Sequence, residues 1–328
     1  MNEGATKPTK SATAFRIVSI AALIAAIGQI TLGGTVRVTG SGDACPDWPL
    51  CHGQIIPPFD YHVILEYSHR VTGSVLGILI LVAVFIAWRY LRDNRPAKVS
   101  TAAAFLFVVA AGVLGGATVL TELTWWVRLI HLSIAELTIA SIAVMTVAGW
   151  PSKGIAAVSK VNLGGGAGTR RLVIASLVGV FLLILYGSYI VGMGYGSSCS
   201  SWPLCNDSLM PEGRAYMEHM GHRYLSLLIG IVLGYAVVQA YIRGDGNKHV
   251  RMAALLAGGA FVFQTGVGAA LVWSGFATQF KAIHLSMATL VWVALVYLAV
   301  FIYASQGVIL GARKEKPLAA KGLERATT

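Results

Sequence analysis

The sequence has few charged residues for its length. Charged side chains make up 12% of the 328 residues, hydrophobic residues make up 56%, and the mean hydropathy is +0.69. A chain with so little polar material cannot cover the surface of a soluble globule of this size, which excludes a soluble protein. We therefore expect an all-α integral membrane protein whose surroundings are the lipid bilayer.

Acidic residues are especially scarce, with 14 against 25 basic residues and a net charge of +11. A basic chain can bind nucleic acid, but nineteen of the 25 basic residues lie in the two tails and after the second, fourth and sixth apolar runs. That distribution follows the positive-inside rule and argues against a nucleic-acid partner. We expect a multi-pass protein of the bacterial cytoplasmic membrane with both termini in the cytoplasm.

The apolar runs predict eight transmembrane helices. Each run approaches or exceeds the roughly 20 residues that cross a bilayer. The first has a basic flank like a secretory signal, but no small-residue cleavage pattern follows it, so we expect it to be retained. The predicted helices span residues 15–36, 63–88, 101–120, 126–148, 172–191, 215–241, 252–272 and 280–303.

The chain repeats one histidine pattern in its two halves. Ser68-His69-Arg70 is matched by Gly221-His222-Arg223, and Ile130-His131-Leu132-Ser133 by Ile283-His284-Leu285-Ser286. His222 follows His69 by 153 residues, and His284 follows His131 by the same number. We infer that one ancestral unit was duplicated.

The duplication predicts two tandem four-helix bundles, at residues 15–150 and 171–304. Tails at 1–14 and 305–328 flank them, and a linker at 151–170 contains the glycine-rich stretch Asn162-Leu-Gly-Gly-Gly-Ala-Gly168. No strand precedes this stretch, so a flexible joint is a better interpretation than a phosphate-binding loop. Because each half has an even number of helices, we expect a pseudo-two-fold axis along the membrane normal.

The four repeated histidines lie near the outer ends of their predicted helices. A single histidine of this kind is usually a packed residue bonded to a neighbouring carbonyl. Matched pairs in both halves instead favour bis-histidine ligation of two haems, because imidazole is a common axial ligand and facing bundle helices often build such sites. His69 would pair with His131, and His222 with His284.

Basic residues adjoin all four histidines. Arg70 and Arg223 directly follow one, while Arg128 and Lys281 each precede one by three residues. We expect these cations to bind haem propionates, with arginine able to do so in bidentate fashion. The alternative is that they reach toward lipid headgroups.

The two halves differ in their carboxylates. Glu66 precedes His69 by three residues where the second half has His219, and Glu136 corresponds to Thr289. An ionisable group inside a membrane costs about 3 kcal/mol, so it is a candidate for function. We hypothesise that the first half performs proton-coupled chemistry and that the second half passes electrons. Glu66-x-x-His69 also matches one element of a di-iron site, but the second element is missing.

Four cysteines lie as two close pairs in the long outer loops, at about residues 37–62 and 192–214. Cys45 with Cys51, and Cys199 with Cys205, are expected to form local disulfides worth roughly 2 kcal/mol each. A redox-active role for the first pair stays open. Zinc is less favoured, because neither loop supplies four clear ligands. We treat His52, His62 and His249 as loop residues and leave His219 unassigned.

Over about residues 15–305 these features together resemble the haem A synthase family, membrane enzymes that convert haem O to haem A for terminal oxidases. The motifs that carry the resemblance are Gly33-Gly-Thr-Val-Arg37, Cys45-x5-Cys51, Glu66-x-x-His69-Arg70, Gly115-Gly-Ala-Thr-Val-Leu-Thr121, His131-Leu, Trp202-Pro-Leu-Cys205, His222-Arg223 and His284-Leu285.

The resemblance implies roles for several of these residues. His69 and His131 would bracket the substrate haem O, Glu66 would be needed for the reaction, and His222 and His284 would hold a haem b cofactor. It also implies a Cys45–Cys51 disulfide near the substrate. A haem O synthase would supply the substrate, an unidentified acceptor such as a quinone would take the electrons, and a homo-oligomer stays open.

The family reaction oxidises a porphyrin methyl group to a formyl group. If His69 and His131 both bind the iron, no coordination site is open to oxygen. Then either one histidine must leave the iron, or electrons are withdrawn from the porphyrin and water adds to the oxidised methyl group. We favour the second route, with Glu66 orienting or deprotonating that water. Two other functions remain: a two-haem protein that carries electrons from quinone to an outer thiol or partner, and a carrier that hands on haem unaltered.

Overall fold

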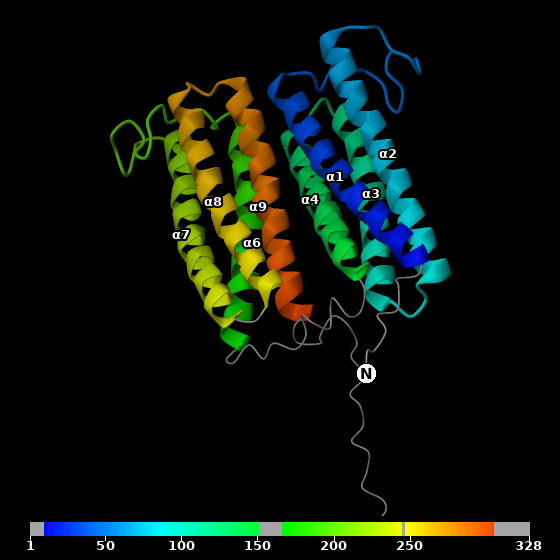
Figure 1. The fold of residues 1–328 in the computed structure, drawn as a ribbon. Helices are drawn as coiled ribbons and strands as arrows, with labels where there is room; N and C mark the ends of the chain where they lie inside the picture. Colours follow the sequence, from blue (N-terminus) through cyan, green and yellow to red (C-terminus); the bar gives the residue numbers. More distant parts are fainter. Residues whose placement is uncertain (1–9, 151–165, 245–246, 305–328) are drawn as a thin grey trace, which may run out of the picture.

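A computed structural model describes residues 10–150, 166–244 and 247–304 of the chain. Within these ranges the protein consists of eight α-helices with two isolated β-bridges and no strand (Figure 1). All eight helices are long and apolar enough to cross a membrane. The expected all-α membrane fold is confirmed.

Every predicted helix is present, and most extend beyond the apolar run that predicted them. The reason is that capping residues are polar and lie outside the run. Asn94 caps α3 by accepting the N–H of Ala97, and Pro96 occupies the first turn, so this helix begins before residue 101. The helices are α1 Lys10–Val38, α2 Tyr61–Tyr90, α3 Arg95–Leu120, α4 Trp125–Ala148, α6 Gly166–Gly192, α7 Arg214–Arg243, α8 Lys248–Trp273 and α9 Thr278–Ala304.

The same capping effect corrects two sequence expectations. His62 and His249 were expected in loops, but they lie in the first turns of α2 and α8, because Asp60 and Asn247 cap these helices just before them. Helix α6 begins at Gly166, so the end of the expected linker 151–170 is helical. Residues 151–165 of that linker lie outside the described residues.

The helices form two groups of four, α1–α4 and α6–α9, that stand side by side (Figure 1). Within each group, consecutive helices contact one another and the first helix contacts the last. Between the groups, α4 packs against α6 and α9, and α1 packs against α9. Helix α9 therefore lies at the centre of the molecule. Its most apolar window is 61% buried, against 11% for α3, which faces outward.

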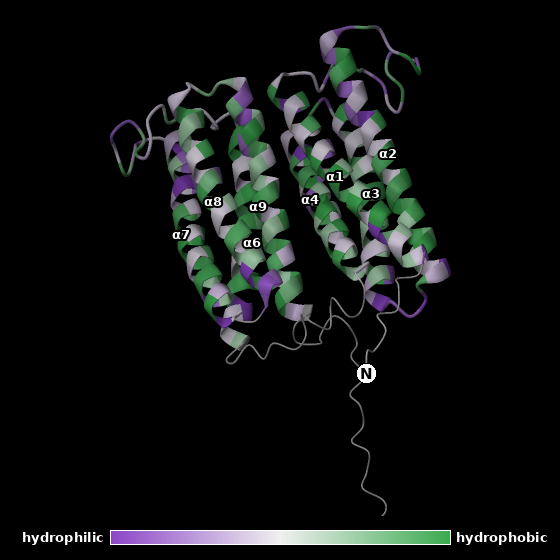
Figure 2. Ribbon diagram, viewed as in Figure 1, coloured by the Kyte–Doolittle hydropathy of each residue, from purple (hydrophilic) through white to green (hydrophobic). Residues whose placement is uncertain are grey.

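Hydrophobic residues recur along all the helices, and many of the hydrophilic residues lie near helix ends and in loops (Figure 2). The core includes fully buried Ile139 and Ile142 on α4 and Leu295 and Leu298 on α9. In a bilayer the lipid tails are as apolar as these side chains, so the hydrophobic effect does not drive the helices together. Close van der Waals packing between the helices holds the bundle together instead.

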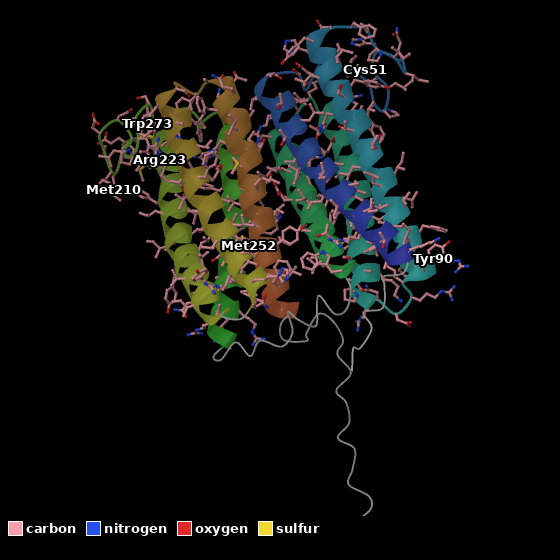
Figure 3. All side chains as sticks on the ribbon, viewed as in Figure 1. Cys51, Tyr90, Met210, Arg223, Met252 and Trp273 are labelled. Carbon is pink, nitrogen blue, oxygen red and sulfur yellow. A yellow bond between two sulfur atoms is a disulfide. The ribbon has the colours of Figure 1, made fainter. Side chains whose placement is uncertain are left out.

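Both long loops lie at the same end of the molecule, and each contains a disulfide. The structure joins Cys45 to Cys51 and Cys199 to Cys205, with six residues of separation in each case. Each loop also has a cis peptide bond before a proline, at Trp48–Pro49 and Trp202–Pro203. Figure 3 shows Arg223 and Trp273 of the second half at this end of the molecule. Met252 of the second half and Tyr90 of the first half lie toward the opposite end.

Candidate functional site

The four repeated histidines come from α2, α4, α7 and α9, and the structure brings them together in the expected pairs. His69 lies within electrostatic range of His131, and His222 within range of His284. Each pair belongs to one four-helix group. All four side chains are half-buried. The protein thus contains two imidazole pairs, one in each half.

A glycine on the preceding helix faces each histidine ring. Without a side chain, glycine lets the ring lie directly against the helix backbone. A Cβ atom at each glycine would lie close to the histidine Cε1 atom: 2.6 Å for Gly33 and His69, 3.4 Å for Gly115 and His131, 3.1 Å for Gly187 and His222, and 3.2 Å for Gly268 and His284. Each of the four histidine rings therefore packs against a glycine of the preceding helix.

Imidazole nitrogens in both halves lack a protein partner. The Nδ1 atoms of His69, His131 and His222 are buried without a hydrogen bond among the described residues. The ring nitrogens of His284 lie 3.2 and 3.4 Å from Gln264 Nε2. Buried polar atoms without partners are costly unless a ligand satisfies them. Two imidazole pairs that contain such nitrogens and whose rings pack against glycines fit two haem irons.

Two glutamines that the sequence analysis missed support these histidines. Gln29 Nε2 on α1 donates to the carbonyl oxygen of His69 at 2.8 Å, and Gln264 Nε2 on α8 donates to that of His284 at 2.9 Å. The amides fix the histidine-bearing helices against their neighbours. An amide within an apolar helix needs such a partner, and that need was the available signal.

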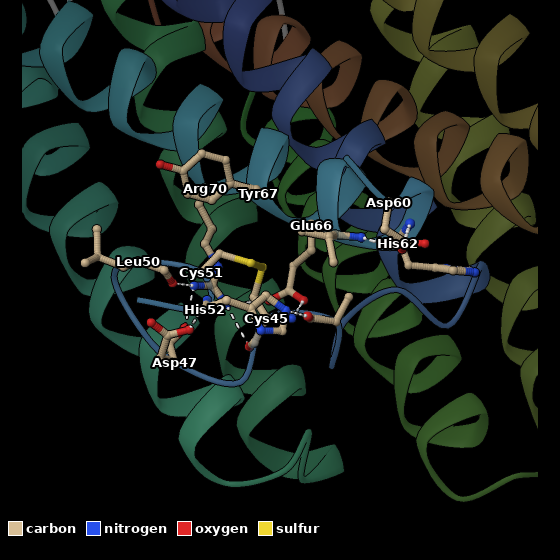
Figure 4. The surroundings of a disulfide bond; sticks show 12 residues. Cys45, Asp47, Leu50, Cys51, His52, Asp60, His62, Glu66, Tyr67 and Arg70 are labelled. Carbon is tan, nitrogen blue, oxygen red and sulfur yellow. Dashed lines mark hydrogen bonds and ion pairs between the residues drawn. A yellow bond between two sulfur atoms is a disulfide. The ribbon is translucent and has the colours of Figure 1, made fainter. Parts of the chain in front are cut away.

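Glu66 is buried and bonded through both carboxylate oxygens (Figure 4). Oε2 accepts the backbone N–H of Cys45 at 2.8 Å, and Oε1 accepts from Arg70 Nη2 at 2.6 Å. The carboxylate therefore lies directly beneath the first disulfide, three residues before His69 on α2.

Arg70 uses its terminal nitrogens on the same loop. Nη1 donates to the carbonyl oxygens of Asp47 at 2.6 Å and Leu50 at 2.5 Å, and Nη2 donates to that of Cys45 at 3.2 Å as well as to Glu66. Because these four bonds use every N–H of Nη1 and Nη2, only the Nε–H of Arg70 could still bind a propionate, as the sequence analysis expected. In this structure Arg70 anchors the disulfide loop to α2.

In the second half, an arginine again binds the carbonyl oxygens of the disulfide loop, but a histidine takes the place of Glu66. Arg223 Nη1 donates to the carbonyl oxygens of Ser201, Pro203 and Leu204 at 2.8 to 2.9 Å, while its Nη2 is buried without a partner. The N–H of Cys199 donates to Nδ1 of His219 at 3.1 Å. His219, unassigned from the sequence, thus does for the second loop what Glu66 does for the first.

Glu136 lies five residues after His131 on α4, where α4 contacts α9. Its Oε1 accepts from Thr289 Oγ1 at 2.7 Å, and its carbonyl oxygen accepts from Trp292 Nε1 at 2.9 Å. Oε2 is buried without a partner. This carboxyl group therefore joins the two halves.

Outside the membrane-spanning helices, Asp47 organises the turn of the first loop. Its Oδ1 accepts the N–H of His52 at 2.6 Å and its Oδ2 that of Gly53 at 2.8 Å. The N–H of Gly53 is the main cause of the lowered pKa of Asp47, and the N–H of His52 contributes.

The described residues contain no group of three or more His, Cys, Asp or Glu side chains placed to hold a metal ion. Neither the zinc nor the di-iron interpretation therefore gains support. Lys281, in the first turn of α9, and Arg128, in the first turn of α4, lie within one turn of His284 and His131. Arg128 Nε is buried without a partner.

Comparison with known proteins identifies the family of this chain. The family model described as cytochrome oxidase assembly protein (COX15-CtaA) matches residues 16–219 and 212–327. A protein named heme A synthase from Exiguobacterium sp. is 26% identical over 279 residues, covering 84% of this chain and 89% of that protein.

Two other relatives carry the same name. The heme A synthase of Alkalihalophilus pseudofirmus is 25% identical over 294 residues, covering 88% of this chain and 97% of its own length. That of Symbiobacterium thermophilum is 31% identical over 203 residues, covering 60% of this chain and 66% of its own length. Because the family model matches nearly the whole chain, the protein belongs to the cytochrome oxidase assembly family that includes the haem A synthases.

Proposed function

We propose that the protein is a haem A synthase, an oxidoreductase that converts a methyl group of haem O to the formyl group of haem A. The observation that carries the proposal is the pair of imidazoles in each half, set against glycines and with buried nitrogens that lack partners. The family and the names of its relatives support the same conclusion. The substrate would come from a haem O synthase.

We assign the two halves different tasks. In residues 15–150, His69 and His131 bind the iron of the substrate haem O. In residues 171–304, His222 and His284 would hold a haem b cofactor, and Arg223 and Lys281 would pair with its propionates. When bound, haem b supplies a one-electron carrier for the electrons leaving the substrate.

The reaction needs both electrons and protons to leave. A methyl group plus one water gives a formyl group, four protons and four electrons, so an acceptor such as a quinone must be reduced. If His69 and His131 both bind the iron, water would supply the oxygen of the product. Glu66 holds a proton at Oε1 or Oε2, and Arg70 and the Cys45 N–H keep its carboxylate in place.

A pseudo-two-fold axis along the membrane normal is part of this proposal. Exchanging the halves converts the α1–α9 contact into the α6–α4 contact and leaves α4–α9 unchanged, which supports the axis. Glu136 and Thr289, which bond to each other, are separated by the repeat distance of 153 residues. Both described ends of the helical region, the start of α1 and the end of α9, lie opposite the disulfide loops, as cytoplasmic termini require.

The function is tested by supplying haem O to cells that make the protein and weighing the extracted pigments by mass spectrometry. Formyl porphyrin is the expected product. Unaltered haem O would instead indicate the electron-transfer protein or the haem carrier. A redox-active Cys45–Cys51 pair, as the electron-transfer alternative requires, would label with thiol reagents under mild reductant.

Replacement of Glu66 tests its role within that reaction. Glu66→Gln should keep the bound haem spectrum and lose formyl product, because glutamine fills the same space but cannot carry the proton. Glu122→Gln, an exposed position between α3 and α4, is the matched control and should keep full conversion. Undiminished product in the Glu66 variant would reject the assignment.

A further inference from the structure

Two arginines of the first half have no acidic partner among the described residues. Arg37 is in the last turn of α1, Arg128 is in the first turn of α4, and the two are near enough for their charges to interact. Among the described residues, the ion pairs are Arg70 with Glu66 and Arg214 with Glu218, neither of which includes Arg37 or Arg128. Two adjacent cations in a half-buried place need an anion to offset their desolvation and mutual repulsion.

Arg37 reaches from the first half into the second. Its Nη1 donates to Oγ of Ser188 on α6 at 2.9 Å, and its Nη2 donates to the Ser188 carbonyl oxygen at 3.2 Å. Ser188 directly follows Gly187, the glycine that faces the ring of His222. The guanidinium group of Arg37 therefore lies at the junction of the two halves. The residue that it binds, Ser188, is next in sequence to the glycine that packs against His222.

Arg128 approaches the same place from the first histidine site. It precedes His131 by three residues and so lies on the same face of α4, one turn closer to the outer end. Its Nε is buried without a partner. Beside it, the rings of Trp125 and Tyr189 make an edge contact at 5.6 Å that joins α4 to α6. These arginines thus face an interface within the protein, which distinguishes them from residues that reach out to lipid.

We propose that Arg37 and Arg128 form a carboxylate site at the junction of the halves, which binds a propionate of the porphyrin held by His69 and His131. The inference rests on the proposed function and goes beyond it, because it adds Arg37 to the substrate site and turns the propionate edge of the substrate toward the second half. Guanidinium groups bind carboxylates through paired, charge-assisted hydrogen bonds. A lipid phosphate has the same chemistry and is the other source of such an anion.

The test compares iron protoporphyrin IX with its dimethyl ester, which lacks the carboxylate charges. Both are titrated spectroscopically into the purified full-length protein with its second site already filled. The wild type should bind the free acid about 10-fold to 100-fold more tightly than the ester, the range expected for a charged hydrogen-bonded pair. Arg37→Gln and Arg128→Gln should each weaken acid binding about tenfold, and the double variant should abolish the preference.

Two further variants separate charge from structure. Arg89→Gln, at the opposite end of α2, is the matched control and should bind both probes as the wild type does. Ser188→Ala keeps both cations and removes only the Oγ acceptor of Arg37, while the bond from Nη2 to the backbone carbonyl at position 188 remains. Its loss of acid preference should therefore be smaller than that of Arg37→Gln. In every variant the low-spin signal from the second site should persist, which shows that the protein is folded.

The outcomes that overturn the inference differ from those that overturn the function. Equal first-site affinity for acid and ester in the wild type would reject the arginine site and leave the haem function standing. Loss of co-purified anionic phospholipid from the arginine variants, with porphyrin preference unchanged, would assign the site to lipid and also reject the inference. Failure of the wild type to bind either porphyrin in its first half would reject both.

Discussion

Replacement of Gly33 by alanine should displace the His69 ring from its place against α1. The new Cβ would lie 2.6 Å from Cε1 of His69, 3.2 Å from Nε2 and 3.3 Å from Nδ1. Carbon atoms in contact are about 3.5–4.0 Å apart, so the ring must withdraw by about 1 Å. Overpacking of this kind costs about 1–3 kcal/mol, which corresponds to a roughly 5-fold to 150-fold loss of porphyrin affinity if the ring is an iron ligand.

The assay is a spectroscopic porphyrin titration of the first half, with thermal unfolding measured in parallel. Gly28→Ala on the same helix is the matched control, because its Cβ would meet no atom within 4 Å. Alanine is favoured over glycine within a helix by about 0.5–1 kcal/mol, so this control should bind normally and be at least as stable as the wild type. Gly115→Ala, at 3.4 Å from His131 Cε1, should be tolerated far better than Gly33→Ala.

A folded Gly33→Ala protein that binds porphyrin as tightly as the wild type would refute this reasoning. Such a result would mean that the His69 ring does not need its position against α1 to hold the substrate. Equal losses in the Gly28 and Gly33 variants would also refute it, since they would trace the effect to α1 as a whole.

Two further predictions concern the loops. Because Asp47 has a lowered pKa, its contribution to loop order should be complete above its ordinary value of 3.8 and be lost as the pH falls below it. The protection factors of the His52 and Gly53 amides, which are corrected for the intrinsic pH dependence of exchange, should therefore fall at low pH. Asp47→Asn should show no such acid dependence, and identical profiles would contradict this. His219→Ala should accelerate exchange of the Cys199 amide, whose acceptor it removes, while the Cys45 amide on Glu66 stays protected.

The helices and the histidine pairs could be predicted because their signals are local or repeated. Apolar runs predict membrane-spanning helices regardless of what the helices pack against. The 153-residue repeat shows from the sequence alone that His69 corresponds to His222. The helix ends were predicted less well, because caps such as Asn94 and Asn247 lie outside the apolar runs.

The surroundings of the histidines could not be predicted in the same way. The bonds of Arg70 run to backbone carbonyls, and the path of the Cys45–Cys51 loop decides which carbonyls lie within reach. The chain has 37 glycines, so no local pattern separates Gly33, which faces His69, from Gly28, which faces open space. Contacts between halves, such as that of Arg37 with Ser188, depend on how the two bundles dock.

The most direct test of the central claim is the low-spin b-type haem spectrum of purified protein carrying His222→Ala or His284→Ala. His249→Ala is the control, because His249 lies at the opposite end of the second half, against the rings of Trp150 and Phe301. The account predicts that the low-spin signal disappears from both ligand variants and remains in the control. A folded His222→Ala or His284→Ala protein that keeps the signal would contradict it.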